Sequence, residues 1–280
     1  MSRKNSIIFF IFIYLVTIAV LLKSAAPAVS GSAGLTAMLI ESSLPCMEVV
    51  EASDAGAEAG SSAVTAEDTG ESGEKTEAVK KNNGKPRVLI YHTHATESYL
   101  PASAGNYHTT AEENTVRDAG DVLEATLEEN GIAVIHDKTL HDNPSYNNSY
   151  SRSYETVTAL LKKYPTIECI IDLHRDATAA EVAGQVEKVN GKTCSVYSYV
   201  LSNTTNTYSA NKAFLDRLNG IAAADYGGYT GNILERPYWY NQELCEKSVL
   251  IEMGNNRNNI KDVRRCAEVF GEILSKALNE

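Results

Sequence analysis

The residues best suited to chemistry begin with His92, His94 and Glu97, which lie within six positions of one another. They follow the short apolar run 88–90, which predicts a buried strand. Histidine nitrogens and carboxylate oxygens are ligands of catalytic zinc, which takes three protein ligands and keeps a position for water. This spacing at the end of a strand therefore predicts part of a zinc site.

Two more polar clusters follow apolar runs later in the chain. His174 and Arg175 come after the run 169–173. Glu252 and Asn255 come after a third run, 249–251. In open α/β sheets, ligands bind at the carboxyl ends of the strands. If the three strands are neighbours in the sheet, the three clusters meet at one edge.

The predicted zinc ligands are His94, Glu97 and His174. Glu97 is the nearest candidate for the carboxylate ligand, and Glu112 or Glu113, at the start of the next predicted helix, is the competitor. The alternative to a metal site is a set of ordinary polar residues at strand ends.

The remaining residues of the clusters are given supporting or catalytic roles. If the first strand continues, His92 shares a face with His94 and is either a ligand or a neighbour that supports one. Glu252 ends a very apolar strand, and a pKa raised by partial burial would suit a general base. The alternative for Glu252 is a structural carboxylate that accepts hydrogen bonds from amides. Arg175 and Asn255 are the predicted substrate-binding residues, although ligand orientation or an internal ion pair explains the first and turn formation the second.

The elements that must position these clusters alternate between strands and helices. This alternation predicts an α/β domain with three layers, in which a doubly wound, mostly parallel sheet carries helices on both faces. A turn at Asn190-Gly191 would pair the segment 181–189 with the strand that follows it. Apolar periodicity places strands over 88–92, 132–135, 169–173, 193–201 and 249–251, and helices around 116–127, 154–164, 214–221 and 260–278.

The segment before this domain predicts a membrane anchor. Arg3 and Lys4 precede the uncharged apolar run 7–22, and a helix from about residue 5 to 26 could cross a bilayer of roughly 30 Å. The basic flank comes first, so the rest of the chain is expected outside the cytoplasm. The alternative is a cleaved signal peptide, with small residues at 25–28 near a cleavage site.

Residues 27–86 are expected to form a flexible, acidic, extracytoplasmic linker. From residue 51 onward the segment is rich in Ala, Gly, Ser, Thr and Glu, and residues 51–80 account for −6 of the net charge of −11. Such a composition cannot bury enough apolar surface to offset the entropy of ordering. The predicted organisation is therefore an anchor over 1–26, a disordered linker over 27–86 and a catalytic domain over 87–280.

Composition narrows the class of protein. The 280 residues are 43% hydrophobic, which is enough for one good-sized core. A net charge of −11 argues against nucleic acid as a partner. The five cysteines show no metal-binding spacing, so buried free thiols or a single disulfide are the alternatives. Ser98 lacks the Gly-x-Ser-x-Gly elbow of a serine hydrolase.

Three runs resemble the stage II sporulation protein P family. They are LIYHTHATESY over 89–99, IDLHRD over 171–176 and LIEMG over 250–254. The segments 136–139 and 240–242 also look like intervening segments of that family, and the resemblance covers about residues 87–280.

The resemblance implies an activity and assigns residues to it. The family is similar to zinc-dependent N-acetylmuramoyl-L-alanine amidases, whose doubly wound domain binds zinc through two histidines and a glutamate. By position, His94 and His174 match the zinc histidines and Glu252 matches the catalytic glutamate. The metal glutamate of the amidases lies farther from the first histidine than Glu97 does, which keeps Glu113 as an alternative.

The resemblance further implies a substrate, a location and partners. The substrate is peptidoglycan, cleaved at the N-acetylmuramoyl–L-alanine amide bond, with endopeptidase activity on stem-peptide cross-links also ascribed. The chain would act in septal wall degradation and engulfment during sporulation. It would be held in the cell membrane by a single span, beside a membrane-bound lytic transglycosylase and a third membrane protein.

A non-catalytic peptidoglycan-binding or scaffold protein on the same fold is the alternative function. The long tether and the aromatic-rich segment 226–240 motivate it, because aromatic side chains beside amides suit glycan or peptide binding. Simple packing explains the aromatic residues as well.

Overall fold

The computed structural model describes residues 84–280. The predicted anchor and almost all of the predicted linker lie outside these residues. Within 84–280, no helix combines the length and the apolar character needed to cross a membrane. The division into anchor, linker and catalytic domain therefore stays a prediction.

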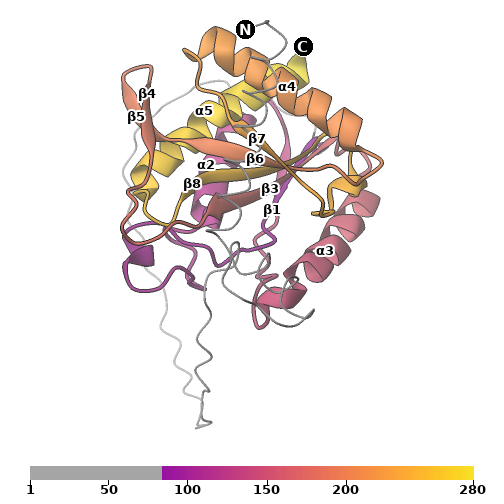
Figure 1. The fold of residues 1–280 in the computed structure, drawn as a ribbon. Coiled ribbons are helices and arrows are strands. Elements are labelled where there is room, and N and C mark those ends of the chain that lie inside the picture. The colour runs from indigo at the N-terminus through magenta and orange to yellow at the C-terminus, as the bar shows by residue number, and fades with distance from the viewer. Residues whose placement is uncertain (1–83) are drawn as a thin grey trace, which may run out of the picture. The chain divides into compact units, whose positions relative to one another are not determined.

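A six-stranded sheet forms the centre of the domain, in the order β2-β1-β3-β8-β6-β7 (Figure 1). Neighbouring strands are parallel except for β6 and β8, which pair antiparallel. The fold is thus mixed α/β with a mostly parallel sheet, as the alternation of strands and helices predicts. The strands are β1 Val88–Tyr91, β2 Val134–His136, β3 Cys169–Asp176, β6 Tyr197–Ser202, β7 Asn232–Arg236 and β8 Ser248–Asn255.

The central strands contain apolar runs without polar alternation because both faces of the sheet are buried. In β1, Val88 and Ile90 belong to one core, and Leu89 and Tyr91 belong to a second core on the other face. This is the period of two that a strand imposes on its side chains.

Helices cover the two faces unequally. The larger core takes the apolar sides of α2 (Val116–Glu129), α4 (Tyr208–Asp225) and α5 (Ile260–Asn279). The smaller core takes Val157 from α3 (Ser149–Lys163). Figure 1 shows α2 and α5 close together beside the sheet.

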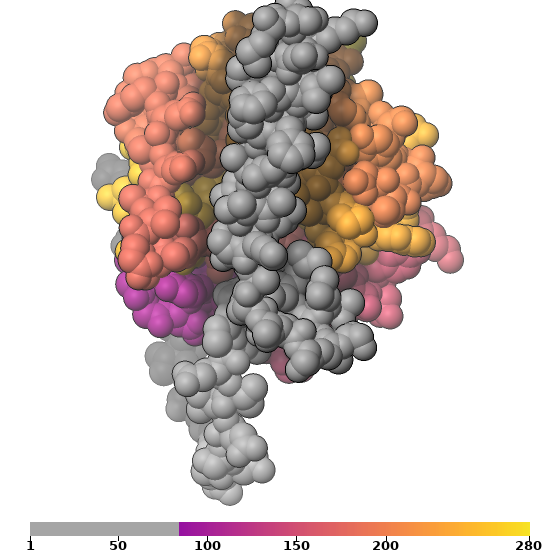
Figure 2. Space-filling view, viewed as in Figure 1, coloured from indigo at the N-terminus to yellow at the C-terminus, as the bar shows by residue number. Residues whose placement is uncertain are grey.

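A two-stranded hairpin stands apart from the main sheet, and Figure 2 shows it at one side of the molecule. Its strands are β4 (Val186–Val189) and β5 (Lys192–Ser195), joined by Asn190 and Gly191. Both turn residues have positive φ, of 49° and 79°, as a tight hairpin turn requires. The turn prediction is confirmed, but the predicted strand 193–201 is in fact two strands that belong to different sheets.

Other elements also differ from the predicted ones. β1 ends at Tyr91, one residue before His92. β2 begins at Val134 because the amide of Ile132 still bonds to a carbonyl of α2, that of Leu127. β7 lies in the segment 226–240, where no strand was predicted, because only one of its five residues is even partly buried and no apolar period marks it.

The four cysteines of the described part are free thiols, as one of the two alternatives for them predicts. Burial raises the pKa of each thiol above its usual value. They are Cys169, Cys194, Cys245 and Cys266.

Candidate metal centre

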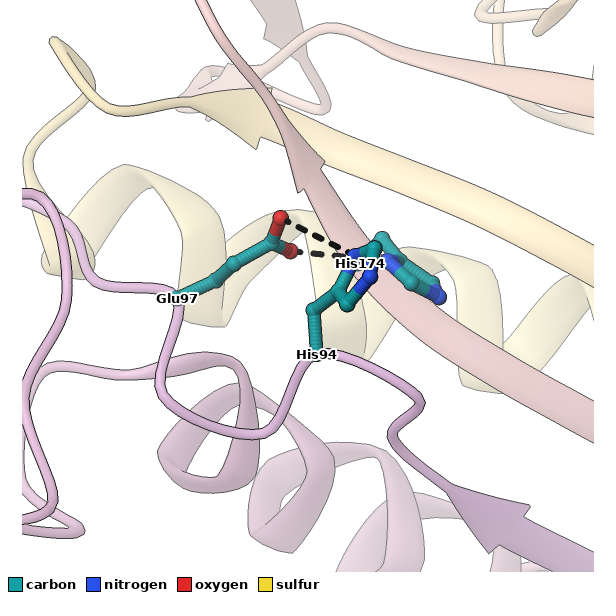
Figure 3. Close-up of side chains that lie close together, drawn as sticks. All are labelled: His94, Glu97 and His174. Atoms are coloured by element: carbon teal, nitrogen blue, oxygen red, sulfur yellow. Dashed lines mark ion pairs between the residues drawn. The ribbon is translucent and has the colours of Figure 1, made fainter. Parts of the chain in front are cut away.

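The three predicted clusters meet at one edge of the sheet. β1, β3 and β8 are adjacent and parallel, so their carboxyl ends lie together. The loop after β1 carries His94 and Glu97, and β3 carries His174 (Figure 3). One nitrogen from each histidine and one Glu97 oxygen all lie within 4.8 Å of one another.

Glu97 lies between the two histidines. Its Oε1 is 3.6 Å from Nδ1 of His94, and its Oε2 is 3.5 Å from Nδ1 of His174. The two rings are nearly perpendicular, with centroids 4.9 Å apart. Two imidazole nitrogens and one carboxylate are the donor set of a catalytic zinc site, so these residues fit that ion.

Asp172 orients His174. Its Oδ1 is 2.9 Å from Nε2 of His174, which leaves Nδ1 facing Glu97. Asp172 also accepts hydrogen bonds from the amide and the hydroxyl of Thr93, at 2.8 and 2.6 Å. Burial opposes a charge on His174, but Asp172 and Glu97 outweigh it and raise its pKa well above the usual value. A carboxylate behind a histidine is the usual support of a metal ligand.

The sequence also indicates the supporting role of Asp172, although the predicted site residues do not include it. It is a lone carboxylate inside an apolar strand, between Ile171 and Leu173. A buried carboxylate must be paired, and the residue on the same face two positions along the strand is His174.

Arg175 lies against Glu97 and is only 5% exposed. Its amide donates to Oε2 of Glu97 at 3.0 Å, and its Nη1 is 3.8 Å from Oε1. Its Nη2 donates to the carbonyl of Tyr107. Burial disfavours the charge on Glu97, but Arg175, His174 and His94 together hold its pKa well below the usual value. The structure therefore places Arg175 against the candidate ligand Glu97, and its role in substrate binding stays a prediction.

The competing carboxylates lie outside this group. Glu112 and Glu113 are exposed, and Glu112 pairs with Lys138. Of the three acidic candidates, Glu97 is the one that the structure brings to the two histidines. Its role as a zinc ligand stays a prediction.

His92 is not in the group of candidate ligands. Its Nδ1 is 2.9 Å from the carbonyl oxygen of Leu173, and its Nε2 is 2.8 Å from Nε2 of His136. Both ring nitrogens are thus occupied. The expectation of a face shared with His94 fails because the strand ends at Tyr91, before the pair begins.

Two tyrosines complete the surroundings of His94. The ring of Tyr146 stacks on the imidazole with centroids 4.2 Å apart, and its hydroxyl is 3.3 Å from Nδ1. Tyr150 meets the same imidazole edge-on, at 5.6 Å. Both precede or begin α3, and their spacing from His94 in the sequence gives no signal of this contact.

Glu252 lies across from His174 in the paired strands β3 and β8. Its Oε2 has no hydrogen-bond partner. Burial raises its pKa to about 8; the charge of His174 opposes this shift, and the carboxylates of Glu97 and Asp176 add to it. This is the environment that a general base needs to exchange protons near neutral pH.

Glu252 and Asn255 both line a cavity of about 500 Å³ beside the centre. Asn255 accepts a hydrogen bond from the amide of Arg257, so it also shapes the turn after β8. Its predicted role in substrate binding stays a prediction.

Partial likeness to solved structures is found among cell-wall amidases. N-acetylmuramyl-L-alanine amidase Ami1 from Mycobacterium smegmatis aligns over 70% of this chain and 98% of its own, with 13% identity and a TM-score of 0.45. The catalytic domain of the amidase CwlV from Bacillus (Paenibacillus) polymyxa aligns over 69% and 98%, with 14% identity and a TM-score of 0.43. The CwlD amidase from Clostridioides difficile, solved in complex with the GerS lipoprotein, aligns over 69% and 98%, with 11% identity and a TM-score of 0.42.

Likeness in sequence points to one family. Stage II sporulation protein P of Bacillus subtilis (strain 168) is 26% identical over 215 residues, which are 70% of this chain and 52% of that protein. The chain thus spans about half the length of the curated relative that it matches. The family described as Stage II sporulation protein P (SpoIIP) matches residues 17–275. Because that match extends over well more than half of the sequence, the chain belongs to the stage II sporulation protein P family.

Proposed function

We propose that the chain is a zinc-dependent peptidoglycan hydrolase that cleaves the N-acetylmuramoyl–L-alanine amide bond. The observation that carries the proposal is the meeting of His94, Glu97 and His174 with Glu252 at one sheet edge, in a member of this family. A zinc ion held by the first three residues would supply Lewis acidity toward the scissile carbonyl.

Glu252 is proposed as the general base and then the general acid. It takes a proton from the attacking water and passes it to the leaving amine. A pKa raised to about 8 supports both steps, because the carboxylate accepts a proton near neutral pH and releases it again.

The other polar residues are proposed to hold the centre and the substrate. Arg175 and Asp172 keep Glu97 and His174 in place through the contacts described above. Asn255, Ser198 and Thr230 line the adjacent cavity, where amide and hydroxyl groups of a muropeptide would find partners. Endopeptidase action on stem-peptide cross-links in the same cleft is part of the proposal.

The site of action is proposed to be the septal space during sporulation, in septal wall degradation and engulfment. The predicted single membrane span over residues 1–26 and the family support this location. A membrane-bound lytic transglycosylase and a third membrane protein are the proposed partners.

A non-catalytic wall-binding protein is the second candidate. Tyr238 and Trp239 favour it, because they are 62% and 64% exposed and offer aromatic faces to a glycan or a peptide.

Digestion of purified peptidoglycan by the full-length protein, followed by mass spectrometry of the fragments, separates these functions. We expect about one zinc per chain and stem peptides released at the lactyl amide. Glu252→Gln should keep the zinc and lose nearly all turnover, while Glu128→Gln, at an exposed position on α2, should behave as the wild type. Full activity after chelation would contradict the zinc mechanism, and binding to the wall without fragments would favour the second candidate.

A further inference from the structure

A second group of titratable side chains lies behind the candidate metal centre. Within residues 84–280, Asp121, Glu124 and His136 form the other cluster with the makings of a metal site. The side chain of His136 is 1% exposed, with Nδ1 3.1 Å from Asp121 and 3.3 Å from Glu124. Its Nε2 is 2.8 Å from Nε2 of His92. The proposed reaction leaves this group without a role.

The hydrogen-bond partners fix the positions of the ring protons. Nδ1 of His92 faces the carbonyl oxygen of Leu173, which can only accept, so this nitrogen carries hydrogen. The two carboxylates of the group face His136 and not His92, so the positive charge belongs on His136 and the ring of His92 is neutral. Nε2 of His92 is therefore a lone pair, and the proton between the two rings belongs to His136.

His136 must also carry a cation on its other side. Nδ1 faces two carboxylates, which only accept hydrogen bonds, so it holds either a proton or a metal ion. Burial disfavours the charged ring, but Asp121 and Glu124 outweigh it and raise the pKa of His136.

The charges around the group decide between a proton and a metal. Nζ of Lys138 is 2.6 Å from Oδ1 of Asp121. The same ammonium also pairs with Glu112. With Lys138 and a protonated His136, the three carboxylates of Glu112, Asp121 and Glu124 keep a single net negative charge. That is little to hold a divalent cation, so the doubly protonated ring explains the arrangement.

Gly120 makes room for the pair of rings. A Cβ atom at this position of α2 would lie 2.5 Å from Cε1 and Nε2 of His136 and 3.2 Å from Cε1 of His92. Glycine inside a helix costs about 1 kcal/mol relative to alanine. Gly120 thus makes α2 less stable than alanine would, and the two imidazoles occupy the space that a Cβ atom would need.

We propose that His136 is a positioning residue for the metal centre. Held by Asp121 and Glu124, it fixes the ring of His92, and His92 fixes the carbonyl of Leu173, the residue before His174. The chain of contacts joins α2 and β2 to the peptide plane that carries a candidate ligand. The inference rests on the proposed function, since it takes His174 as a ligand.

Zinc affinity of the full-length protein tests the proposal. His136→Leu should lower it by about 10- to 100-fold, the usual effect of losing a residue that supports a ligand. Gly120→Ala should do the same without removing any polar group. His136→Gln, whose amide can still donate to His92, should lose less. We expect kcat to fall while KM changes little, because none of these substitutions removes a contact with the substrate.

A pair of double variants with equal charge change isolates the role of the carboxylates. Asp121→Asn with Glu124→Gln should weaken zinc binding. Glu128→Gln with Glu129→Gln, at exposed positions of the same helix, should leave zinc affinity and activity unchanged. Equal zinc affinity in His136→Leu and the wild type would overturn the proposal. So would a second zinc equivalent that disappears in the Asp121, Glu124 variant.

Nitrogen-15 spectra of the imidazoles in the zinc-free protein keep this test separate from the function. At pH 7, we expect both nitrogens of His136 to be protonated, His92 to be neutral with hydrogen on Nδ1, and the His174 resonances to shift in His136→Leu. If the wild type bound no zinc, the proposed function would fail while these signals still supported the positioning contact. A neutral His136, or His174 resonances that do not move, would overturn the inference itself.

Discussion

Two of the three candidate ligands are held by a charged residue outside the group. Asp172 turns His174 through Nε2, and Arg175 contacts both oxygens of Glu97. Buried charges are stable only when paired in this way, and removing one partner leaves the other uncompensated. The geometry of the centre therefore depends on the supporting residues as much as on the candidate ligands.

Glu252 is the exception, because burial dominates its surroundings. Its pKa is raised from 4.5 to about 8. Between these values the folded zinc-free protein keeps a proton that the unfolded chain releases. The unfolding free energy contributed by this group therefore falls as pH rises from about 4.5 to about 8.

Chemical unfolding of the zinc-free protein at pH 5 and at pH 8 checks this dependence. Glu252→Gln cannot ionise. We therefore expect the unfolding free energy of this variant, measured relative to the wild type, to be higher at pH 8 than at pH 5. Glu128→Gln, which is exposed, serves as the control. The prediction fails if the difference between Glu252→Gln and the wild type is the same at both pH values.

Spacing after apolar strands was enough to find the residues that the structure groups, His94, Glu97 and His174. Their supports could not be found in the same way. The contact of His94 with Tyr146 depends on where a loop lies across the sheet edge, and no local pattern encodes that position. The face shared by His92 and His94 was not found, because a strand that stops at Tyr91 no longer imposes its alternation.

At the scale of elements, apolar runs identify the buried strands but do not identify the exposed ones. β3 and β8 each contain an uninterrupted apolar run, over 169–171 and 249–251, and their pairing as neighbours was the condition for the site. β7 lies at the sheet edge with most of its residues exposed. Its hydrogen bonds to β6 are long-range pairings, which a local sequence pattern does not specify.

The packing of α2 against α5 depends on one glycine. A Cβ atom at Gly271 would lie 2.8 Å from Cγ2 of Thr126 and 3.3 Å from Cδ1 of Leu123. Overpacking of a core costs about 1–3 kcal/mol, more than the roughly 1 kcal/mol that alanine contributes as a better helix former.

We therefore expect Gly271→Ala to lower the free energy of unfolding by about 1 kcal/mol. The matched control is Gly220→Ala on α4, where a Cβ atom would meet nothing within 4 Å. That variant should be more stable than the wild type by about 0.5–1 kcal/mol. Urea unfolding measures both changes, and a shift of the same sign in the two variants would contradict close packing at Gly271.

For the whole molecule, the candidate centre is a junction between segments far apart in the sequence. His94 and Glu97 come from the loop after β1, whereas His174 comes from β3, about 80 residues later. An ion that binds these ligands only in the folded protein stabilises the entire domain by mass action. Metal binding should thus report on folding as well as on catalysis.

Zinc should raise the unfolding temperature of the protein, and chelation should lower it again. At a free zinc concentration of about 100 times Kd, the expected gain is about 2.7 kcal/mol. His174→Ala removes a ligand from the middle of the sheet, so its unfolding temperature should respond much less to zinc. Gly220→Ala leaves the centre intact and should respond as fully as the wild type. If zinc raised the unfolding temperature of His174→Ala as much as that of the wild type, the stabilising zinc site would not include His174, and this prediction would be wrong.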